Sequence, residues 1–426
     1  MNKFTELTQV KPEETKGVIY SFVFIFILMA GYLIVRPVRD ALPSEWGDVS
    51  RAVQWSFTFV ISTIAVSIYN VLASRISLSK LVPGVFIFFG LSFLAIYGFA
   101  MLDFQKGLLG KVFYVWSSVF SLFHVSVFWS FTSQAYSKAQ SKRVYGFINT
   151  GASAGAIVGP LIVVLFARRL PLESVLLLTS ACLFAVLPLI AVLNRIHKDS
   201  GKLHDESLGN LSANPFSGFK DLVTHKQLRK IALFIFMMSG VATFLYVFQS
   251  DLLADYSKPE RKELLGSLDL ATNVLTILLG VFAANRITRK FGLATALAIV
   301  PFFVAVMFML LSLNAAVMFV LALQLMRKAG NYSITRPARE ILYTGVSKEA
   351  RFKTKPIIDV AVYRGADVFW IWSLAFLGDG YLNLNITQKL WIGAVIAIVW
   401  GLLGVFLGRA YESERGEVEP LEPKNT

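Results

Sequence analysis

An eleven-residue pattern occurs twice in this chain, each time at the end of an apolar stretch of membrane-spanning length. The first copy is residues 32–42, YLIVRPVRDAL, and the second is residues 332–342, YSITRPAREIL. Six residues are identical in register, and Asp40 corresponds to Glu340. This block predicts an internally duplicated membrane transporter, because such proteins keep paired elements that hold substrate or close gates. The alternative is that basic clusters recur because they anchor helices at lipid headgroups.

The composition is that of a membrane protein. Of its 426 residues, 55% are hydrophobic and 16% are charged, and apolar runs of about twenty residues recur along its length, as expected for membrane-spanning helices. We therefore predict an all-α membrane protein with twelve transmembrane helices in two six-helix halves. The predicted spans are 17–35, 52–73, 81–102, 112–134, 144–167, 174–194, 231–250, 267–285, 292–313, 315–335, 356–378 and 389–410.

The distribution of basic residues predicts the topology. If the N-terminus is cytoplasmic, the inner segments hold 27 of the 41 lysines and arginines and the outer segments hold 10. Cytoplasmic loops carry an excess of these residues, so we expect both termini to be cytoplasmic, in the inner (plasma) membrane of a bacterium. The formal charge of +14 is then a topology signal, and no nucleic-acid binding is expected.

The predicted domains are an N-terminal half (1–194), a cytoplasmic linker (195–230), a C-terminal half (231–411) and a disordered cytoplasmic tail (412–426). The single cysteine, Cys182, excludes a disulfide framework. The sequence contains no phosphate-binding glycine loop, metal-ligand cluster or nucleophile–base pair. We therefore expect no enzyme, no catalytic residue, no metal and no cofactor. A monomer would suffice for this architecture.

Charges inside the spans are the main functional candidates, because a charge at mid-membrane costs about 2.5–3.5 kcal/mol on insertion scales. Arginine in a wet cavity selects anions and matches phosphate or carboxylate in a bidentate manner. We therefore predict a small anionic substrate. The candidate substrate-binding residues are Arg36, Arg39, Asp40, Asn149, Arg327, Lys328, Arg336, Arg339, Lys355, Arg364 and Asp367.

Several of these candidates have structural alternatives. Arg364 and Asp367 are three residues apart, so they can form an ion pair that only stabilises the protein. Arg327 and Lys328 mark an anion site unless span ten ends before them. His124 is a possible proton relay or a packing residue.

Two features resemble the major facilitator superfamily. The loops after spans two and eight contain Arg75-Ile76-Ser77 and Arg286-Ile287-Thr288, and basic residues in these loops are typical of that superfamily. Span five carries Gly151, Gly155, Gly159 and Pro160. In some exchangers of the superfamily such a stripe occurs in the same helix, and it equally suits close helix packing.

The chain also resembles the ATP/ADP translocases of plastids and intracellular bacteria. Residues 36–40 resemble the Arg-x-x-Lys-Asp segment of that family, and Phe128-Trp129-Ser130-Phe131 resembles its Phe-Trp-Gly-Phe segment. Residues 336–360 resemble its Pro-x-Lys-Glu…Tyr…Lys-Gly-Lys-Ala-Ala-Ile-Asp-Val segment. The resemblance implies nucleotide transport by exchange in a major-facilitator-like fold. This chain lacks the family's acidic residue before the tryptophan of span four and its glutamate in span seven, and Arg39 replaces its lysine.

The sequence thus predicts a secondary transporter that moves an organic anion, such as a nucleotide or phosphate ester, by alternating access. Two alternatives stay open. One is a proton-coupled permease or exporter of another solute, with His124 or Asp367 carrying the proton. The other is a non-transporting membrane scaffold, which would need no charged path and would tolerate the loss of Arg39.

Overall fold

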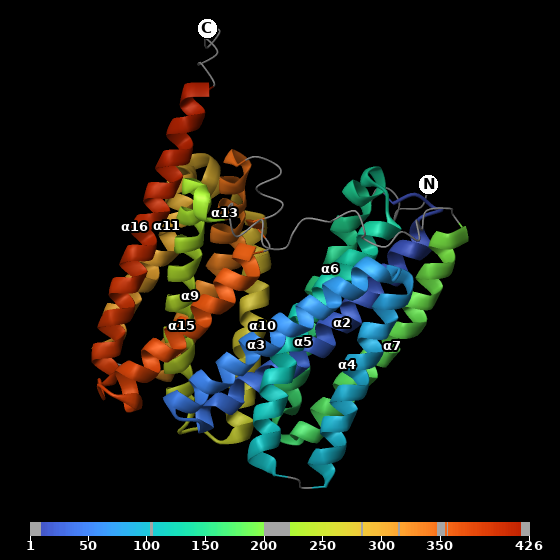
Figure 1. Cartoon of the computed structure of the whole chain (residues 1–426), viewed down its shortest axis with the longest axis horizontal. Coiled ribbons are helices and arrows are strands. Elements are labelled where there is room, and N and C mark those ends of the chain that lie inside the picture. The colour runs from blue at the N-terminus through green and yellow to red at the C-terminus, as the bar shows by residue number, and fades with distance from the viewer. Residues whose placement is uncertain are drawn as a thin grey trace. The chain divides into compact units, whose positions relative to one another are not determined.

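The computed structural model describes residues 10–102, 105–199, 222–282, 284–313, 316–346, 354–355 and 357–418. Every described element is a helix (Figure 1). The longer ones are α2 (Thr15–Ala41), α3 (Asp48–Arg75), α4 (Leu78–Met101), α5 (Lys106–Ala135), α6 (Lys138–Phe166), α7 (Leu172–Asp199), α9 (Lys226–Leu253), α10 (Lys258–Phe282), α11 (Ala284–Leu311), α12 (Val317–Gly330), α15 (Tyr363–Ala375) and α16 (Ile386–Val418). The shorter ones are η1 (Leu42–Glu45), η2 (Ala167–Arg169), η3 (Asn331–Thr335), α13 (Arg336–Leu342), η4 (Tyr343–Gly345), η5 (Ile357–Val362) and η6 (Phe376–Gly380).

Eleven of the described helices are long and apolar enough to cross a membrane. They match eleven of the twelve predicted spans, so the predicted fold class is confirmed. Predicted span ten corresponds to α12, η3 and α13, which follow one another without a break from Val317 to Leu342. The helix therefore continues past Arg327 and Lys328, and whether the membrane-spanning part ends before these two residues stays an open alternative.

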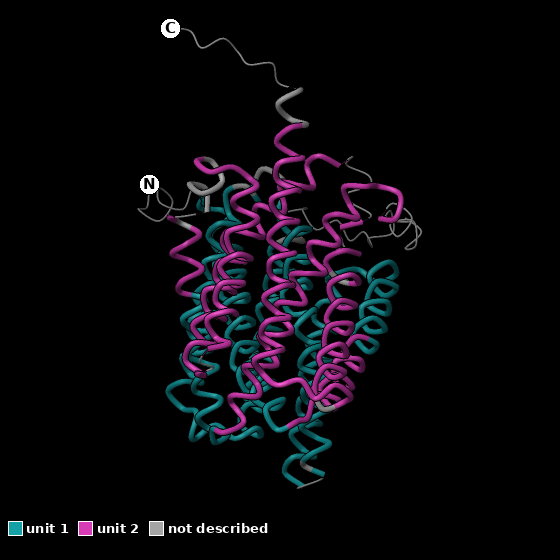
Figure 2. The backbone as a smooth tube through the Cα atoms, turned by 90° about the vertical axis from the view of Figure 1, so that its left-hand side faces the viewer, with its two compact units in different colours: residues 1–45, 60–212, 256–273 teal, residues 46–59, 213–255, 274–426 magenta. Residues whose placement is uncertain are grey.

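The residues form two compact units (Figure 2). Unit 1 consists of residues 1–45, 60–212 and 256–273, and unit 2 of residues 46–59, 213–255 and 274–426. Unit 1 contains most of the predicted N-terminal half, together with the beginning of α10. Unit 2 contains most of the C-terminal half, together with the beginning of α3. The predicted linker falls largely on residues 200–221, outside the described residues.

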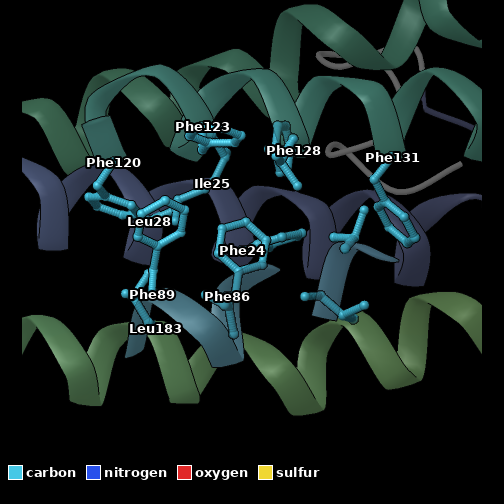
Figure 3. Close-up of a cluster of buried hydrophobic side chains, with 14 of the residues drawn as sticks. Phe24, Ile25, Leu28, Phe86, Phe89, Phe120, Phe123, Phe128, Phe131 and Leu183 are labelled. Carbon is cyan, nitrogen blue, oxygen red and sulfur yellow. The ribbon is translucent and has the colours of Figure 1, made fainter. Parts of the chain in front are cut away.

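The core of unit 1 is built from aromatic side chains on α2, α4 and α5 (Figure 3). Phe24 is fully buried, and its ring centroid lies 5.6 Å from that of Phe86 and 4.9 Å from that of Phe128, both edge-on. Edge-to-face pairs contribute about 0.5–1.5 kcal/mol beyond the burial of their surface. These contacts fix α2, which carries the first copy of the repeat, in the middle of unit 1.

The glycine stripe of α6 allows the closest helix contact in this core. A Cβ atom at Gly151 would lie 2.6 Å from the carbonyl oxygen of Phe22, and one at Gly159 would lie 2.7 Å from that of Ala30. A Cβ at Gly155 would overlap the carbonyl oxygen of Phe26. Any larger residue at these positions would push α2 away from α6. Close packing therefore accounts for the stripe, whether or not it also serves exchange.

Unit 2 has a core of the same kind. Phe244, Phe248 and Phe308 are fully buried, and the ring of Trp400 lies 5.7 Å from that of Phe234. Helix α9 packs against α15 and α16, and α11 packs along α16. A Cβ at Gly240 of α9 would lie 2.6 Å from the Trp370 ring of α15, so α9 and α15 are in close contact at the level of Trp370.

Two helices are longer than predicted. Helix α2 continues through Pro37 to Ala41, beyond the predicted end of span one at residue 35. A single proline removes one backbone hydrogen bond, and the packing of α2 against α5, α6 and α7 supports the helix at this point. Helix α16 continues to Val418, which includes the first residues of the predicted disordered tail. The end of that tail, residues 419–426, lies outside the described residues.

The glycine stripe yields a prediction with an internal control. Gly155→Val should lower the melting temperature of the purified protein in detergent, because overpacking typically costs about 1–3 kcal/mol. The control is Gly146→Val on the same helix, where a Cβ would meet no atom within 4 Å. Equal melting temperatures for the two variants would contradict the packing assignment.

The predicted topology can be tested with single cysteines in a Cys182→Ser background. Leu102, at the end of α4, is 77% exposed, and Thr344, after α13, is also exposed. An impermeant maleimide added outside intact cells should label a Leu102→Cys protein and not a Thr344→Cys protein. Inside-out vesicles should give the reverse. Labelling of both positions from the same side would show that the number of spans between them is wrong.

Candidate functional site

The first copy of the repeat forms an ion cluster at the end of α2, within unit 1. Arg39 donates to Oδ1 of Asp40 at 2.8 Å, and Nε of Arg36 lies 3.7 Å from Oδ2 of the same carboxylate. Nε of Arg36 also lies 3.5 Å from Oδ2 of Asp269 on α10. We call Arg36, Arg39, Asp40 and Asp269 the α2 cluster. It balances two positive against two negative charges.

Burial makes this balance necessary. Asp269 and Asp40 are 4% and 8% exposed, and a buried charge without a partner is strongly destabilising. Asp269 was absent from the candidates predicted from the sequence. It is the only charged residue in predicted span 267–285, and this was the signal that could have identified it.

His124 lies beside this cluster and does not belong to it. Its ring centroid is 4.0 Å from that of Tyr32 and 5.6 Å from that of Phe120. The imidazole is 5% exposed, and it is enclosed by aromatic rings. This environment favours the packing role over the proton relay, because an imidazolium is costly to bury in apolar surroundings.

The second copy forms a corresponding cluster in unit 2. Nη2 of Arg339 lies 3.2 Å from Oδ1 of Asp359 and 3.9 Å from Oε1 of Glu340. Lys355 donates to Oε2 of Glu340 at 2.5 Å. We call Arg339, Glu340, Lys355 and Asp359 the α13 cluster. Like the α2 cluster, it holds two cations and two carboxylates, and it joins the second repeat to the segment that follows it.

Tyr343 is packed under the α13 cluster. The Lys355 ammonium is 5.6 Å from the centroid of its ring, and the side chain is 1% exposed. Burial and the nearby carboxylate of Asp359 raise the pKa of Tyr343 above its ordinary value of 10.0, so the phenol stays protonated near neutral pH. Arg336, the counterpart of Arg36, has an exposed side chain. The two copies therefore use their arginines differently.

A third group of charges lies on α12 and α15 of unit 2. Nη2 of Arg327 donates to Oε1 of Gln324 at 2.8 Å, and Arg327 is 9% exposed. Nη1 of Arg364 lies 3.8 Å from Oδ2 of Asp367, as the sequence spacing predicted. Asp367 also accepts a hydrogen bond from Ser239 of α9. Three stretches of π-helix, η3, η5 and η6, flank these charges in sequence, and such irregular turns are frequent at functional sites.

The fourth group of charges, which also lies in unit 2, was not predicted from the sequence. Nη1 of Arg51, near the start of α3, lies 3.1 Å from Oδ1 of Asp48 and 2.5 Å from Oδ1 of Asp251. Nζ of Lys389 lies 3.2 Å from Oδ2 of Asp48. We call these four residues the α3 cluster. Arg51 is 4% exposed and Lys389 is 8% exposed. In the sequence, Arg51 lies close to a predicted span boundary, where a charged residue ordinarily anchors a helix at the membrane interface. This is why it was not singled out.

The remaining predicted residues are more scattered. Lys328 is half-buried on α12, and Asn149 is exposed on α6. Of the eleven predicted residues, Lys328, Asn149 and Arg336 lie outside the groups described above. The other eight belong to the α2 cluster, the α13 cluster or the charges on α12 and α15. In each cluster at least one arginine already holds a carboxylate, which an incoming anion could replace.

Comparisons with known proteins agree with the predicted fold. The family model of the Major Facilitator Superfamily matches residues 130–338. The chain is 23% identical over 433 residues to ADP,ATP carrier protein 1 of Chlamydia pneumoniae, with 84% of each chain covered. The predicted resemblance to the translocases is thus confirmed as a distant relationship.

Solved structures show the same fold. A bacterial homologue of the iron transporter ferroportin superposes with a TM-score of 0.68 at 13% identity, covering 92% of this chain and 99% of the other. The nucleoside transporter NupG superposes with a TM-score of 0.65 at 11% identity, covering 93% and 99%. The chain is therefore a multi-pass membrane protein with the same fold as these transporters.

The start of α2 is held by a further buried carboxylate, outside the spans. Glu14 accepts hydrogen bonds from Gln140 at 2.9 Å and from Arg143 at 2.8 Å, both on α6. Burial alone would raise the pKa of Glu14. The hydrogen bonds from Gln140 and from the backbone of Lys11, together with the charge of Arg143, outweigh burial and lower the pKa below 4.5. These contacts fix the start of α2 on α6.

This shift predicts a pH-dependent stability. A carboxyl group whose pKa is lower in the folded state stabilises the fold above its unfolded pKa, and the effect disappears as the pH falls through the folded value. Glu14→Gln should therefore lower the melting temperature at pH 7, and its difference from the wild type should shrink below about pH 4.5. Glu13→Gln, at an exposed neighbour, is the control. A difference that is constant with pH would contradict the assignment.

Proposed function

We propose that this protein is a secondary active transporter that moves an organic anion carrying phosphate or carboxylate groups, and exchanges it for a second anion by alternating access. The observation that carries the proposal is the α2 cluster. Two arginines lie in a membrane-spanning helix, and carboxylates of the protein hold them. A dissolved anion of the right geometry competes for the same guanidinium groups.

Nucleotides are the first substrates to test. The chain is a distant relative of a protein named as an ADP,ATP carrier, and the segments on which the resemblance was based contribute to both repeat clusters. Arg39, Glu340, Lys355 and Asp359 all come from those segments. Phosphate oxygens suit such arginine and lysine donors, and the bilayer supplies the hydrophobic surroundings that strengthen each contact.

Exchange follows from how the clusters are balanced. A cluster with equal charges is stable without substrate, and binding an anion releases one of its carboxylates. A second anion must then take the place of the first, or the carboxylate must return, before the arginine is paired again. In this proposal the re-formed cluster locks the transporter, so access changes only with an anion bound, and each anion that leaves is exchanged for another.

The two copies of the repeat suggest separate gating roles. The predicted topology places Arg36, Arg39 and Asp40 toward the outer end of α2, and Arg336, Arg339 and Glu340 toward the inner end of α13. The α2 cluster would then close the outer mouth and the α13 cluster the inner mouth, with one forming as the other breaks. The α3 cluster would assist on the outer side, because α3 begins there.

The direct test is transport by purified protein in liposomes. Vesicles loaded with unlabelled ADP should take up labelled ATP or ADP, whereas empty vesicles should take up little. A panel of sugar phosphates and dicarboxylates identifies the substrate if nucleotides are inactive. Uptake of neutral or cationic solutes alone would refute the anion proposal. No transport of any solute, together with tolerance of Arg39 replacement in cells, would favour a scaffold.

Arg39→Ala should reduce uptake by about 30-fold or more, because the loss of a buried charge contact costs about 2–5 kcal/mol. Arg39→Lys should retain partial activity, because the charge remains without the planar fork. Arg169→Ala is the matched control, since Arg169 is exposed in η2. Normal uptake by a well-inserted Arg39→Ala protein would exclude Arg39 from the path.

A further inference from the structure

Asp367 is a carboxylate buried inside a membrane-spanning helix. It is 8% exposed, and its Oδ1 accepts a 2.5 Å hydrogen bond from the Ser239 hydroxyl of α9. Trp370, one turn further along α15, donates to the carbonyl oxygen of Phe236 on α9 and lies against Gly240. These contacts hold α15 tightly on α9.

The charge of Asp367 is balanced only loosely. Nη1 of Arg364 is 3.8 Å from Oδ2, beyond hydrogen-bonding distance. The Arg364 side chain is 24% exposed, whereas that of Asp367 is 12% exposed. The neighbouring Gly365 faces open space, because a Cβ there would meet no atom within 4 Å. Arg364 is therefore the more accessible member of the pair, and Asp367 is the more enclosed one.

Among the described groups around Asp367, the cation that acts on its carboxylate is Arg364. Helix α15 packs against α9, η5 and η6. From α9 the contact is Ser239, which carries no charge. On η5 the carboxylate is Asp359, which Arg339 holds at 3.2 Å. Tyr363 of α15 interacts electrostatically with Asp367, Arg364, Arg327 and Tyr332. Arg364 is thus the cation that balances Asp367.

We propose that Asp367 takes up one proton when an anion binds to Arg364, so that each transported anion is accompanied by a proton. This rests on the proposed function. The guanidinium turns its donors from Asp367 to the anion, because a doubly ionised phosphate or a carboxylate in reach offers shorter, bidentate contacts. A buried carboxylate without its cation is costly. A proton from the water that delivers the anion neutralises it.

Ser239 suits both protonation states. Its hydroxyl donates to the carboxylate when Asp367 is ionised. When Asp367 is protonated, the carboxyl group can donate to the hydroxyl oxygen instead, because a hydroxyl is both donor and acceptor. Release of the anion returns Arg364 to Asp367, and the proton leaves with the anion. The step moves one proton and forms or breaks no covalent bond.

The test counts protons by calorimetry of ADP binding to the purified protein in detergent. Titrations in buffers of different ionisation enthalpy give the number of protons taken up per ADP. They are done at pH 8, where the ADP phosphates, whose second pKa is about 6, are already ionised. The wild type should take up about one proton per ADP. Asp367→Asn should bind ADP and take up about none, whereas Asp367→Glu should restore the uptake. Asp255→Asn, at an exposed position in the turn after α9, should behave as the wild type.

The outcomes separate the two proposals. ADP binding by the wild type with no proton uptake would overturn the inference and leave the anion transporter intact. Equal uptake by the wild type and Asp367→Asn would overturn it too, because the proton would then bind elsewhere. Inorganic phosphate replaces ADP as the probe if ADP does not bind. If neither binds, the probe is the sugar phosphate or dicarboxylate that the liposomes take up. If the liposomes take up no anion, the proposed function fails, and the inference fails with it. If Asp367→Asn does not fold, Arg364→Gln gives the same test. Without the Arg364 charge, Asp367 is already protonated before ADP binds. The residual ADP binding of this variant should therefore take up no proton.

Discussion

The structure depends on the pairing of charges that lie at or near the ends of membrane-spanning helices. Arginines, lysines and carboxylates occur in membrane-spanning helices here, and each costs several kcal/mol when it is left alone. The chain meets this requirement by grouping them into balanced sets: the α2, α13 and α3 clusters each hold two cations and two carboxylates. The helices that contribute to a cluster are fixed by it.

The same pairing makes these charges suitable for transport. A balanced cluster is closed in the absence of substrate, and it opens when an anion or a proton takes the place of one partner. The same charged groups therefore contribute to stability and to transport, and removing one of them affects both. The close contact of α6 on α2 through its glycines, and that of α15 on α9 through Gly240, provide the rigid parts around which such changes occur.

Much of the fold follows from patterns visible in the sequence. Apolar length identified the spans. The repeat identified Arg36, Arg39 and Arg339 as candidates, which the structure places in ion clusters, and also Arg336, which is exposed. The partners from other segments were harder to find, because Asp269, Asp48 and Asp251 are distant in sequence from the arginines that they bind. Asp269 was detectable as an isolated charge within an apolar span. Asp48 and Asp251 lie at helix ends, where polar residues are ordinary. Span one was predicted to end at residue 35, before Pro37, whereas helix α2 continues through this proline to Ala41 because its packing outweighs the lost hydrogen bond.

A structure determined with ADP bound is the most direct test of the central claim, that the arginines of the repeat receive the substrate anion. Phosphate oxygens should lie within about 3 Å of the guanidinium of Arg36 or Arg39, with the Arg39–Asp40 or the Arg36–Asp269 contact broken. An anion bound away from both repeat clusters, with these ion pairs intact, would contradict it.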